Sequence, residues 1–296
     1  MVTSTASSAA VDLSTLPAPV LVAQPDFATR FAGKLATFLA QDETFTALLE
    51  SDPAYALLEA DSYDEVVLAQ ACNDAAKGML LAFATGPNLD HLGALMDVPR
   101  LTITAATDTA DAVMEGDTAY KRRIQLAPHS FSVAGPELAY VFHALSAHAD
   151  VLDATAVSPS PGEVVVTVMS RSGNGVPSAD VIAAVDAKLQ GAVRPLTDFV
   201  TVQAAEPVDY TIEAQLYVFA GPDQSLILET AQAALTAHVA DVRKLDRDIA
   251  RSAEVAALHV GNVQRVVLLD NTDIPISAGQ FGNATSISVT IAGTEL

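Results

Sequence analysis

The sequence predicts an α+β protein, with an N-terminal helical region containing a long amphipathic helix, followed by two small α/β subdomains. Between residues 53 and 84, apolar side chains recur at helical spacing without an internal proline. After residue 150, the apolar period changes from 3.6 to 2, the period of half-buried strands. We therefore expect an extended arm (1–25), a helical region (26–101), a central α/β subdomain (102–205) and a C-terminal α/β subdomain (206–296).

Composition excludes several classes of function. The chain has 296 residues, of which 50% are hydrophobic, so a sizeable core is possible. Its 36 acidic and 15 basic residues give a net charge of −21, which opposes binding to nucleic acid or to an anionic membrane surface. No apolar run approaches the roughly 18 residues of a transmembrane helix. The first residues lack the basic start and apolar core of a signal peptide, so we expect a chain that is cytoplasmic when made.

The first 50 residues predict an arm and a helix. Pro17, Pro19 and Pro25 exclude a regular helix in the arm. An extended apolar arm is either a docking strap or a loosely packed terminus, and the sequence leaves both open. Phenylalanines and leucines at helical spacing then predict a helix over residues 27–50.

The long helix begins at Asp52-Pro53, an N-cap acceptor followed by a proline at the first helical position. Running to about residue 84, it would be roughly 48 Å long and would need packing partners along its length. We expect Gly86 to stop it with a left-handed backbone. The lone Cys72 excludes an internal disulfide and is predicted to be a small buried hydrophobe. The predicted apolar stripe contains Tyr55, Leu58, Val66, Ala69, Ala76, Leu80 and Phe83, and Phe83, Leu89, Leu92 and Leu95 should close the core around the break at Gly86.

The rest of the chain alternates helices and strands. Asp117 starts a predicted helix that ends at Pro128, and Pro136 opens the next. Strands are predicted over 151–157, 163–169, 199–203, 210–218, 263–270 and 286–293, with helices over 178–190, 224–242 and 251–260. Helix, strand, loop and strand follow one another twice, near 136–169 and 252–292, which suggests two related subdomains.

The sequence shows no signature of catalysis. It contains no Gly-rich phosphate loop, no zinc-type spacing among its six histidines, and no base beside a candidate nucleophile. We therefore expect no catalytic residue, no cofactor and no metal. The basic cluster Lys121, Arg122 and Arg123 has two interpretations that stay open: charges that are solvated or paired within the chain, or a contact with another subunit.

Six segments together carry a resemblance to a known family. They are DLSTLPAP (12–19), NDAAKGMLLAFATGPNLDHLGALMDVPRL (73–101), YKRRIQLAPHSFSVAGPELAYVFHALSA (120–147), SPSPGEVVVTVMSRSGNGVPS (158–178), the stretch 193–223 and RDIARSAEVAALHVGNVQRVVL (247–268). In this order, over nearly the whole chain, they resemble the baseplate J family of contractile-tailed bacteriophages.

The resemblance implies a structural protein of the virion tail baseplate, assembled in the host cytoplasm, and not an enzyme. A tail-associated wall hydrolase would need converging carboxylates or zinc ligands, which the sequence does not show. Family members form baseplate wedges in which a second copy and a smaller wedge subunit join. Neighbouring wedges close a six-fold ring around the hub, contact sheath-initiating baseplate proteins, and serve tail assembly and the triggering of sheath contraction. The alternative is a wedge protein of a phage-derived contractile injection particle.

The same resemblance implies where contacts lie. The N-terminal helices would join a bundle shared by wedge subunits, and the C-terminal subdomains would pair with neighbouring copies. Neither nucleic acid nor a membrane is an expected partner. The candidate interface or motif residues are Tyr55, Leu58, Val66, Leu80, Phe83, Gly86, Leu89, Asp90, Leu92, Arg100, Tyr120, Arg122 and Arg123.

Overall fold

The computed structural model describes residues 11–23, 26–41, 50, 52–132, 134–221 and 223–295. These residues form two compact units. The helical unit contains residues 11–100 and 116–124, and the α/β unit contains residues 101–115 and those from 125 onward. A helical region is followed by small separate sheets that are interleaved with further helices, which confirms the α+β class. The four-part division expected from the sequence stays a prediction.

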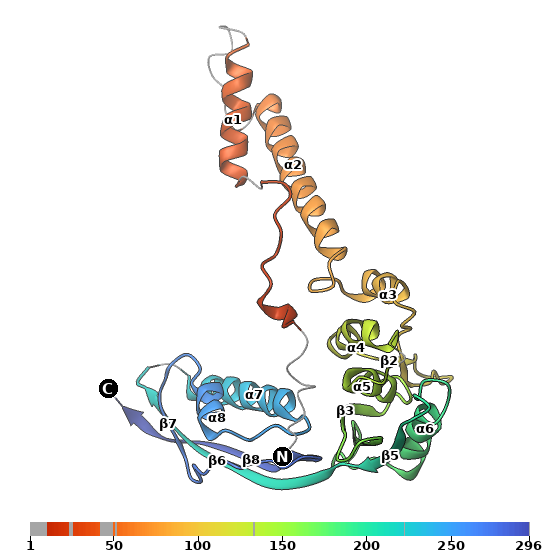
Figure 1. The fold of residues 1–296 in the computed structure, drawn as a ribbon. Helices are drawn as coiled ribbons and strands as arrows, with labels where there is room; N and C mark the ends of the chain where they lie inside the picture. Colours follow the sequence, from red (N-terminus) through yellow and green to blue (C-terminus); the bar gives the residue numbers. More distant parts are fainter. Residues whose placement is uncertain are drawn as a thin grey trace. The chain divides into compact units, whose positions relative to one another are not determined.

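The helical unit is built around two helices that lie side by side, α1 (Phe27–Leu39) and α2 (Pro53–Gly78) (Figure 1). Each begins at an aspartate whose side chain accepts a backbone N–H, from Thr29 for Asp26 and from Ala54 for Asp52. The helix predicted over 27–50 ends at Leu39, with Ala40 as its C-cap, and residues 42–49 lie outside the described residues. The unit also contains the short turn η1 (Leu13–Thr15), α3 (Gly86–Ala94) and the beginning of α4 (Asp117–Ser130).

The break after α2 differs from the prediction in three ways. Helix α2 ends at Gly78 and not near residue 84, because glycine is a poor helix former. A Cβ at this position would lie 2.6 Å from the side-chain nitrogen of Asn88. Gly86 has the expected positive φ, +52°, but it begins α3 instead of ending α2. Leu89 is fully buried as predicted, whereas Leu95 is 77% exposed and closes no core.

Two further expectations about helices are wrong. Helix α4 continues through Pro128 to Ser130, because a proline in the last turn removes a single N–H and leaves the preceding turns intact. Cys72 is exposed, and it lines an open groove with Val22 and Leu68. It lies one residue before the buried Asn73, so its side chain points about 100° away from that residue around α2.

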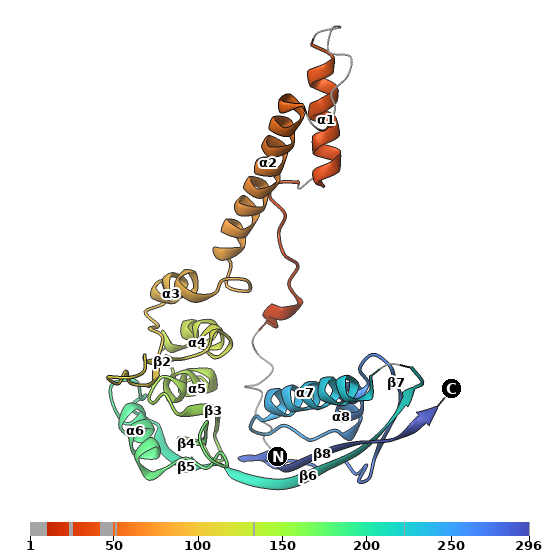
Figure 2. The ribbon, with the colours of Figure 1, turned by 180° about the vertical axis from the view of Figure 1, so that it is seen from behind.

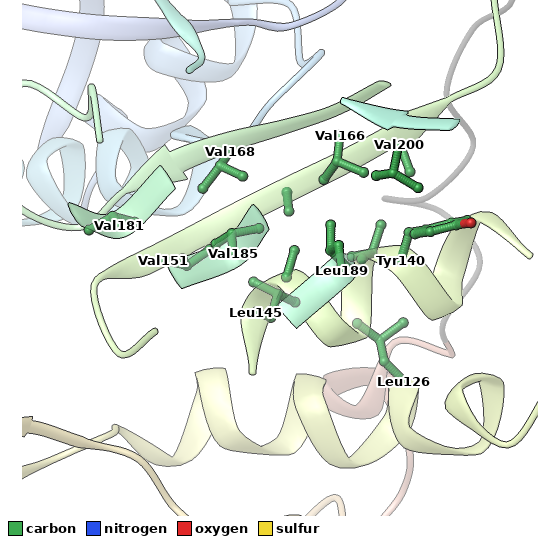
Figure 3. Packing of buried hydrophobic residues seen from close by; sticks show 14 residues of the cluster. Leu126, Tyr140, Leu145, Val151, Val166, Val168, Val181, Val185, Leu189 and Val200 are labelled. Atoms are coloured by element: carbon green, nitrogen blue, oxygen red, sulfur yellow. The ribbon is translucent and has the colours of Figure 1, made fainter. Parts of the chain in front are cut away.

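The first sheet of the α/β unit has the strand order β3-β4-β5. Its strands are β3 (Val151–Val157), β4 (Glu163–Ser170) and β5 (Phe199–Ala204); β3 and β4 form the predicted antiparallel hairpin, and β5 runs parallel to β4. Side chains of the sheet meet those of α5 (Glu137–Leu145) and α6 (Ala179–Leu189) in one core, with Val166 and Leu189 fully buried (Figure 3). A small separate ladder joins β1 (Thr102–Thr104) and β2 (Val113–Met114).

The second sheet has the order β7-β6-β8. Its strands are β6 (Glu206–Phe219), β7 (Val263–Leu268) and β8 (Gln280–Glu295). Helices α7 (Gln224–Val242) and α8 (Arg251–Leu258) cover one face of it (Figures 1 and 2). Tyr210, Ile212, Ala214, Leu216 and Val218 of β6 are all buried, which confirms the alternation read from the sequence.

The two sheets share a pairing scheme but not a chain order. In each, the central strand has one antiparallel and one parallel neighbour. The central strand is the second of the three in the first sheet and the first of the three in the second sheet. Strands β7 and β8 are therefore separated by β6, whereas β3 and β4 are neighbours. The suggested repeat is not a simple repetition.

None of the helices among the described residues combines the length and the apolar character needed to cross a bilayer.

Candidate assembly site in the helical unit

The segment between α3 and α4 places one arginine between two carboxylates. Arg100 contacts Asp90 of α3 through Nε at 2.7 Å and Asp117 of α4 through a terminal nitrogen at 2.8 Å. Its guanidinium carbon lies 4.6 Å from the centre of the Tyr120 ring. We name this group of four residues the arginine junction. It joins α3 to the beginning of α4 within one unit, and 22 residues of chain separate the end of α3 from the start of α4.

The charge of Arg100 is well supported in this position. Its side chain is only 12% exposed, and this burial disfavours the charged form. The hydrogen bonds that Arg100 donates to Asp90 and Asp117 outweigh that effect, so the pKa of the guanidinium lies above its ordinary value. Since both carboxylates keep water access, the pairs stabilise by geometry and by network formation more than by isolated charge attraction.

Close packing fixes the tyrosine of the junction. Tyr120 is 1% exposed, and its hydroxyl donates a 2.7 Å hydrogen bond to the carbonyl of Val98. A Cβ at Gly93 would lie 1.9 Å from the Tyr120 hydroxyl oxygen and 2.8 Å from the Val98 carbonyl oxygen. Real Cβ atoms do not approach other atoms so closely, so only glycine fits beside the tyrosine.

The basic cluster is used within the chain at two of its three positions. Arg123 is 3% exposed and donates to the carbonyl oxygen of Pro99 at 3.0 and 3.3 Å. The amino group of Lys121 donates to the carbonyl oxygen of Ala82 at 2.8 Å. Arg122 is half-buried. For Lys121 and Arg123, the geometry fits the internal interpretation.

The predicted site residues fall into two separate groups. The structure brings Gly86, Leu89, Asp90, Arg100, Tyr120 and Arg123 together around the junction, where the Gly86 N–H also donates to Asp117 at 3.3 Å. Tyr55, Leu58 and Val66 lie half-buried along α2, and the Tyr55 ring meets Phe31 of α1 at 4.7 Å. Phe83 and Leu92 are half-buried, and Leu80 is 41% exposed in the turn after α2.

A second apolar face of α2 was missed by the sequence-based predictions. Leu57, Leu68 and Met79 are 71%, 65% and 76% exposed. They are spaced 11 residues apart, which is close to three helical turns, so Leu57 and Leu68 lie in one line along α2, and Met79, the residue that caps its end, continues that line. Tyr63 and Val67 add exposed apolar surface on another side of α2, at 61% and 48%. The recurrence of large apolar residues every 11 positions could have revealed this face. The sequence-based prediction considered only one apolar stripe and did not look for a second.

The arm is attached to α2 by one side-chain amide. Asn73 is 6% exposed; its oxygen accepts the N–H groups of Leu21 at 2.9 Å and Val22 at 3.0 Å. Its side-chain nitrogen donates to the Val22 carbonyl at 3.0 Å. The amide thus pairs with the arm as a neighbouring peptide group would. This contact favours the docking-strap interpretation over a loosely packed terminus.

The geometry of these sites holds segments of chain together. Among the described residues, no three His, Cys, Asp or Glu side chains are grouped so that they would hold a metal ion. At the junction, Asp90 and Asp117 both form ion pairs with Arg100, so their carboxylates hold parts of the same chain together.

Comparison with known proteins gives the class and then the family. The chain matches two family models, the Baseplate J-like N-terminal domain over residues 50–107 and the Baseplate J-like central domain over residues 132–204. Baseplate protein J of Escherichia phage P2 is 42% identical over 298 residues, covering 96% of this chain and 99% of that protein. A chain of the six-fold symmetrised anti-feeding prophage (AFP) baseplate has 14% identity and a TM-score of 0.41, with the match covering 60% of this chain and 43% of that one.

These matches place the chain among the structural proteins of bacteriophage baseplates. It belongs to the baseplate J-like family. The first model covers α2, α3 and Arg100, so the long helix and two of the four junction residues, Asp90 and Arg100, lie within the family's N-terminal domain.

Proposed function

We propose that this protein is a wedge component of the baseplate of a contractile tail. It pairs with a second copy and a smaller wedge subunit, and neighbouring wedges form the ring around the hub. The observation that carries the proposal is the 42% identity to a phage baseplate protein J over almost the full length of both chains. The role is structural: the protein is needed for tail assembly and for the triggering of sheath contraction, and it performs no catalysis.

The exposed face of α2 supports a helical bundle shared by wedge subunits. Helix α1 packs on one side of α2, and Leu57, Leu68 and Met79 point elsewhere. Burying each of these side chains against a partner helix is worth roughly 1.5–3 kcal/mol. The three together supply enough apolar surface for a helix-in-groove contact, which is the contact that the bundle requires.

The arginine junction suits a protein that transmits force. Two ion pairs, a buried tyrosine hydroxyl bond and a cation–π contact connect α3, the segment after it and α4. Several linked contacts of this kind resist separation better than isolated surface pairs do. We infer that the junction keeps the start of α4 in a fixed register with α3 when the wedge is loaded.

Imaging of particles tests the proposal. The gene is deleted in its phage or prophage, and the induced lysate is examined by negative-stain electron microscopy. We expect heads without finished tails, or sheath and tube material without baseplates, and restoration by the wild-type gene. Complete particles with only an infection defect would reject the wedge role. Headless particles in the wild-type lysate would identify a contractile injection device.

Point variants in the same complementation test locate the bundle contact. The double variant Leu57→Asp/Leu68→Asp should fail to restore baseplates, because two charges would enter the proposed helical interface. The matched control is Leu226→Asp on α7, which is also exposed, at 63%. Restoration by both variants would remove the α2 face from the proposed interface.

A further inference from the structure

Strand β8 presents a long edge that is paired on one side only. Fourteen of its 16 residues pair with β6, from Gln280 to Glu295. Among the described residues, backbone pairing on the other side is confined to the start of the strand, where Leu245 bridges to Phe281 and the Asp246 N–H donates to Gln280. Beyond that point the edge offers a row of N–H and C=O groups to another strand.

The free edge lacks two of the usual protections against such pairing, charged side chains and proline. Residues 281–294 contain no charged side chain and no proline, although the chain carries a net charge of −21. Soluble proteins normally place lysine, proline or bulges on long edges to prevent association. Two register shifts do occur in β8, and between them six residues, from Ser286 to Ile291, pair regularly with β6. The opposite edge of the same sheet, β7, is only six residues long and carries Arg265.

The two faces of this regular stretch differ. On the face covered by helices, Val289 is 4% exposed, and its neighbours Ile287 and Ile291 are packed only partly against the core. On the other face, Ser286, Ser288 and Thr290 are exposed. A further strand beside β8 would complete the burial of both isoleucines and would receive hydroxyl groups on its open face.

We propose that this edge pairs with the same edge of a second copy of the chain, antiparallel and related by a two-fold axis at Val289. The two three-stranded sheets then join into one continuous sheet of six strands. Ile287 lies opposite Ile291 of the second copy, and Ser288 lies opposite Thr290 of the second copy. All of these pairs are compatible across an antiparallel ladder.

Charge favours an identical partner at this place. Two copies that each carry −21 repel one another in general, so a contact between them is most stable where neither contributes a charge. The free edge of β8 is such a place, and antiparallel self-pairing sets no like charges opposite each other. The proposal deepens the proposed function, because it names the surface by which one copy meets another.

Sedimentation of the purified full chain tests the pairing. We expect a monomer–dimer equilibrium over micromolar to millimolar concentrations. In Ser288→Lys/Thr290→Lys, the two lysines of each copy would face those of the other, and the dissociation constant should rise at least about tenfold. The control Thr211→Lys/Gln215→Lys adds the same charge to the same open face on the central strand β6. It should change the dissociation constant less than about twofold. Circular dichroism checks that both variants are folded.

Cross-linking tests the register. In a Cys72→Ser background, Ser288→Cys/Thr290→Cys should give a covalent dimer on mild oxidation, because the two positions face each other across the axis. A monomer at every concentration, a dimer that the edge lysines leave unchanged, or the absence of the cross-linked dimer would overturn the inference. A monomeric chain whose gene deletion still removes baseplates would reject the edge contact alone. A normal particle without the gene would reject the wedge role whatever the chain does in solution.

Discussion

The substitution Gly93→Ala tests whether packing around Tyr120 holds the helical unit together. The new methyl group would lie 1.9 Å from the tyrosine oxygen and 2.8 Å from the Val98 carbonyl oxygen, so the ring must move. Its hydroxyl bond to Val98 is then lost, at about 1 kcal/mol, and overpacking adds roughly 1–3 kcal/mol. Loss of the Arg100 stacking contact costs about 1 kcal/mol more. The better helix propensity of alanine returns up to about 1 kcal/mol, which leaves a net loss near 3 kcal/mol.

Amide hydrogen exchange is the suitable assay, because it reports the free energy of local opening in one unit of a two-unit chain. The amides of α3 and of α4 from residue 120 onward should exchange about a hundredfold faster in the variant, as about 3 kcal/mol corresponds to two decades in an opening equilibrium. The matched control is Gly33→Ala on α1, where a Cβ meets nothing within 4 Å. That variant should be neutral or slightly stabilising.

A double variant tests whether the clash with the Tyr120 oxygen causes the loss of stability in Gly93→Ala. Tyr120→Phe removes the atom closest to the new methyl group, so Gly93→Ala/Tyr120→Phe should lose less stability than the two single variants lose together. Exchange in Gly93→Ala as slow as in Gly33→Ala would refute the reasoning. Strict additivity in the double variant would show that the tyrosine oxygen is not the source of the strain.

Three other predictions concern separate contacts. Arg251 and Glu254 are 2% and 1% exposed and pair at 2.9 Å, so Arg251→Met should lower the free energy of unfolding in urea by about 3–5 kcal/mol. The double variant Arg251→Met/Glu254→Leu should recover most of that stability, and a single variant as stable as the wild type would contradict this. Hydrogen bonding from Arg30 lowers the pKa of Glu65 from 4.5 to about 2, so its stabilising effect on the α1–α2 pair is present above pH 4.5 and is lost as the pH falls toward 2. Glu65→Gln should remove this acid-dependent step in helix content, and a persisting step would assign it elsewhere. Asn73→Ala should speed amide exchange at the arm residues that it binds, and unchanged exchange there would show that other contacts hold the arm.

The sequence predicted best what local chemistry decides. The start of α2 follows from an aspartate cap and a proline, both of which act within one helical turn, and it was found at the expected residue. The end of α2 at Gly78 was missed because the apolar pattern continues to Leu80 and Phe83, beyond the last helical residue. Leu95 failed for the same reason, since apolar character alone does not state which side of a helix is covered.

Strand β8 shows the limit for sheets. The predicted strand covered residues 286–293, and the observed one runs from Gln280 to Glu295. Gly282 and Asn283 are poor strand formers, so local preference made the predicted strand begin too late. Pairing with the long β6 extends the strand past them and accommodates two register shifts. Arg100 and Tyr120, by contrast, were selected through the resemblance to a family, because their contacts span elements that no periodicity connects.

Asn73 attaches the arm to α2 through the arm's backbone, so the arm's side chains remain available for contacts with a partner. The amide binds peptide groups of Leu21 and Val22, which every residue except proline offers in full. Val20 and Leu21 keep 72% and 69% of their surface free. Mutations can therefore change the exposed side chains of the arm without weakening its attachment to Asn73, provided that neither Leu21 nor Val22 is replaced by proline. Such a segment can follow changes in a partner protein over evolution while α2, its anchor, stays the same.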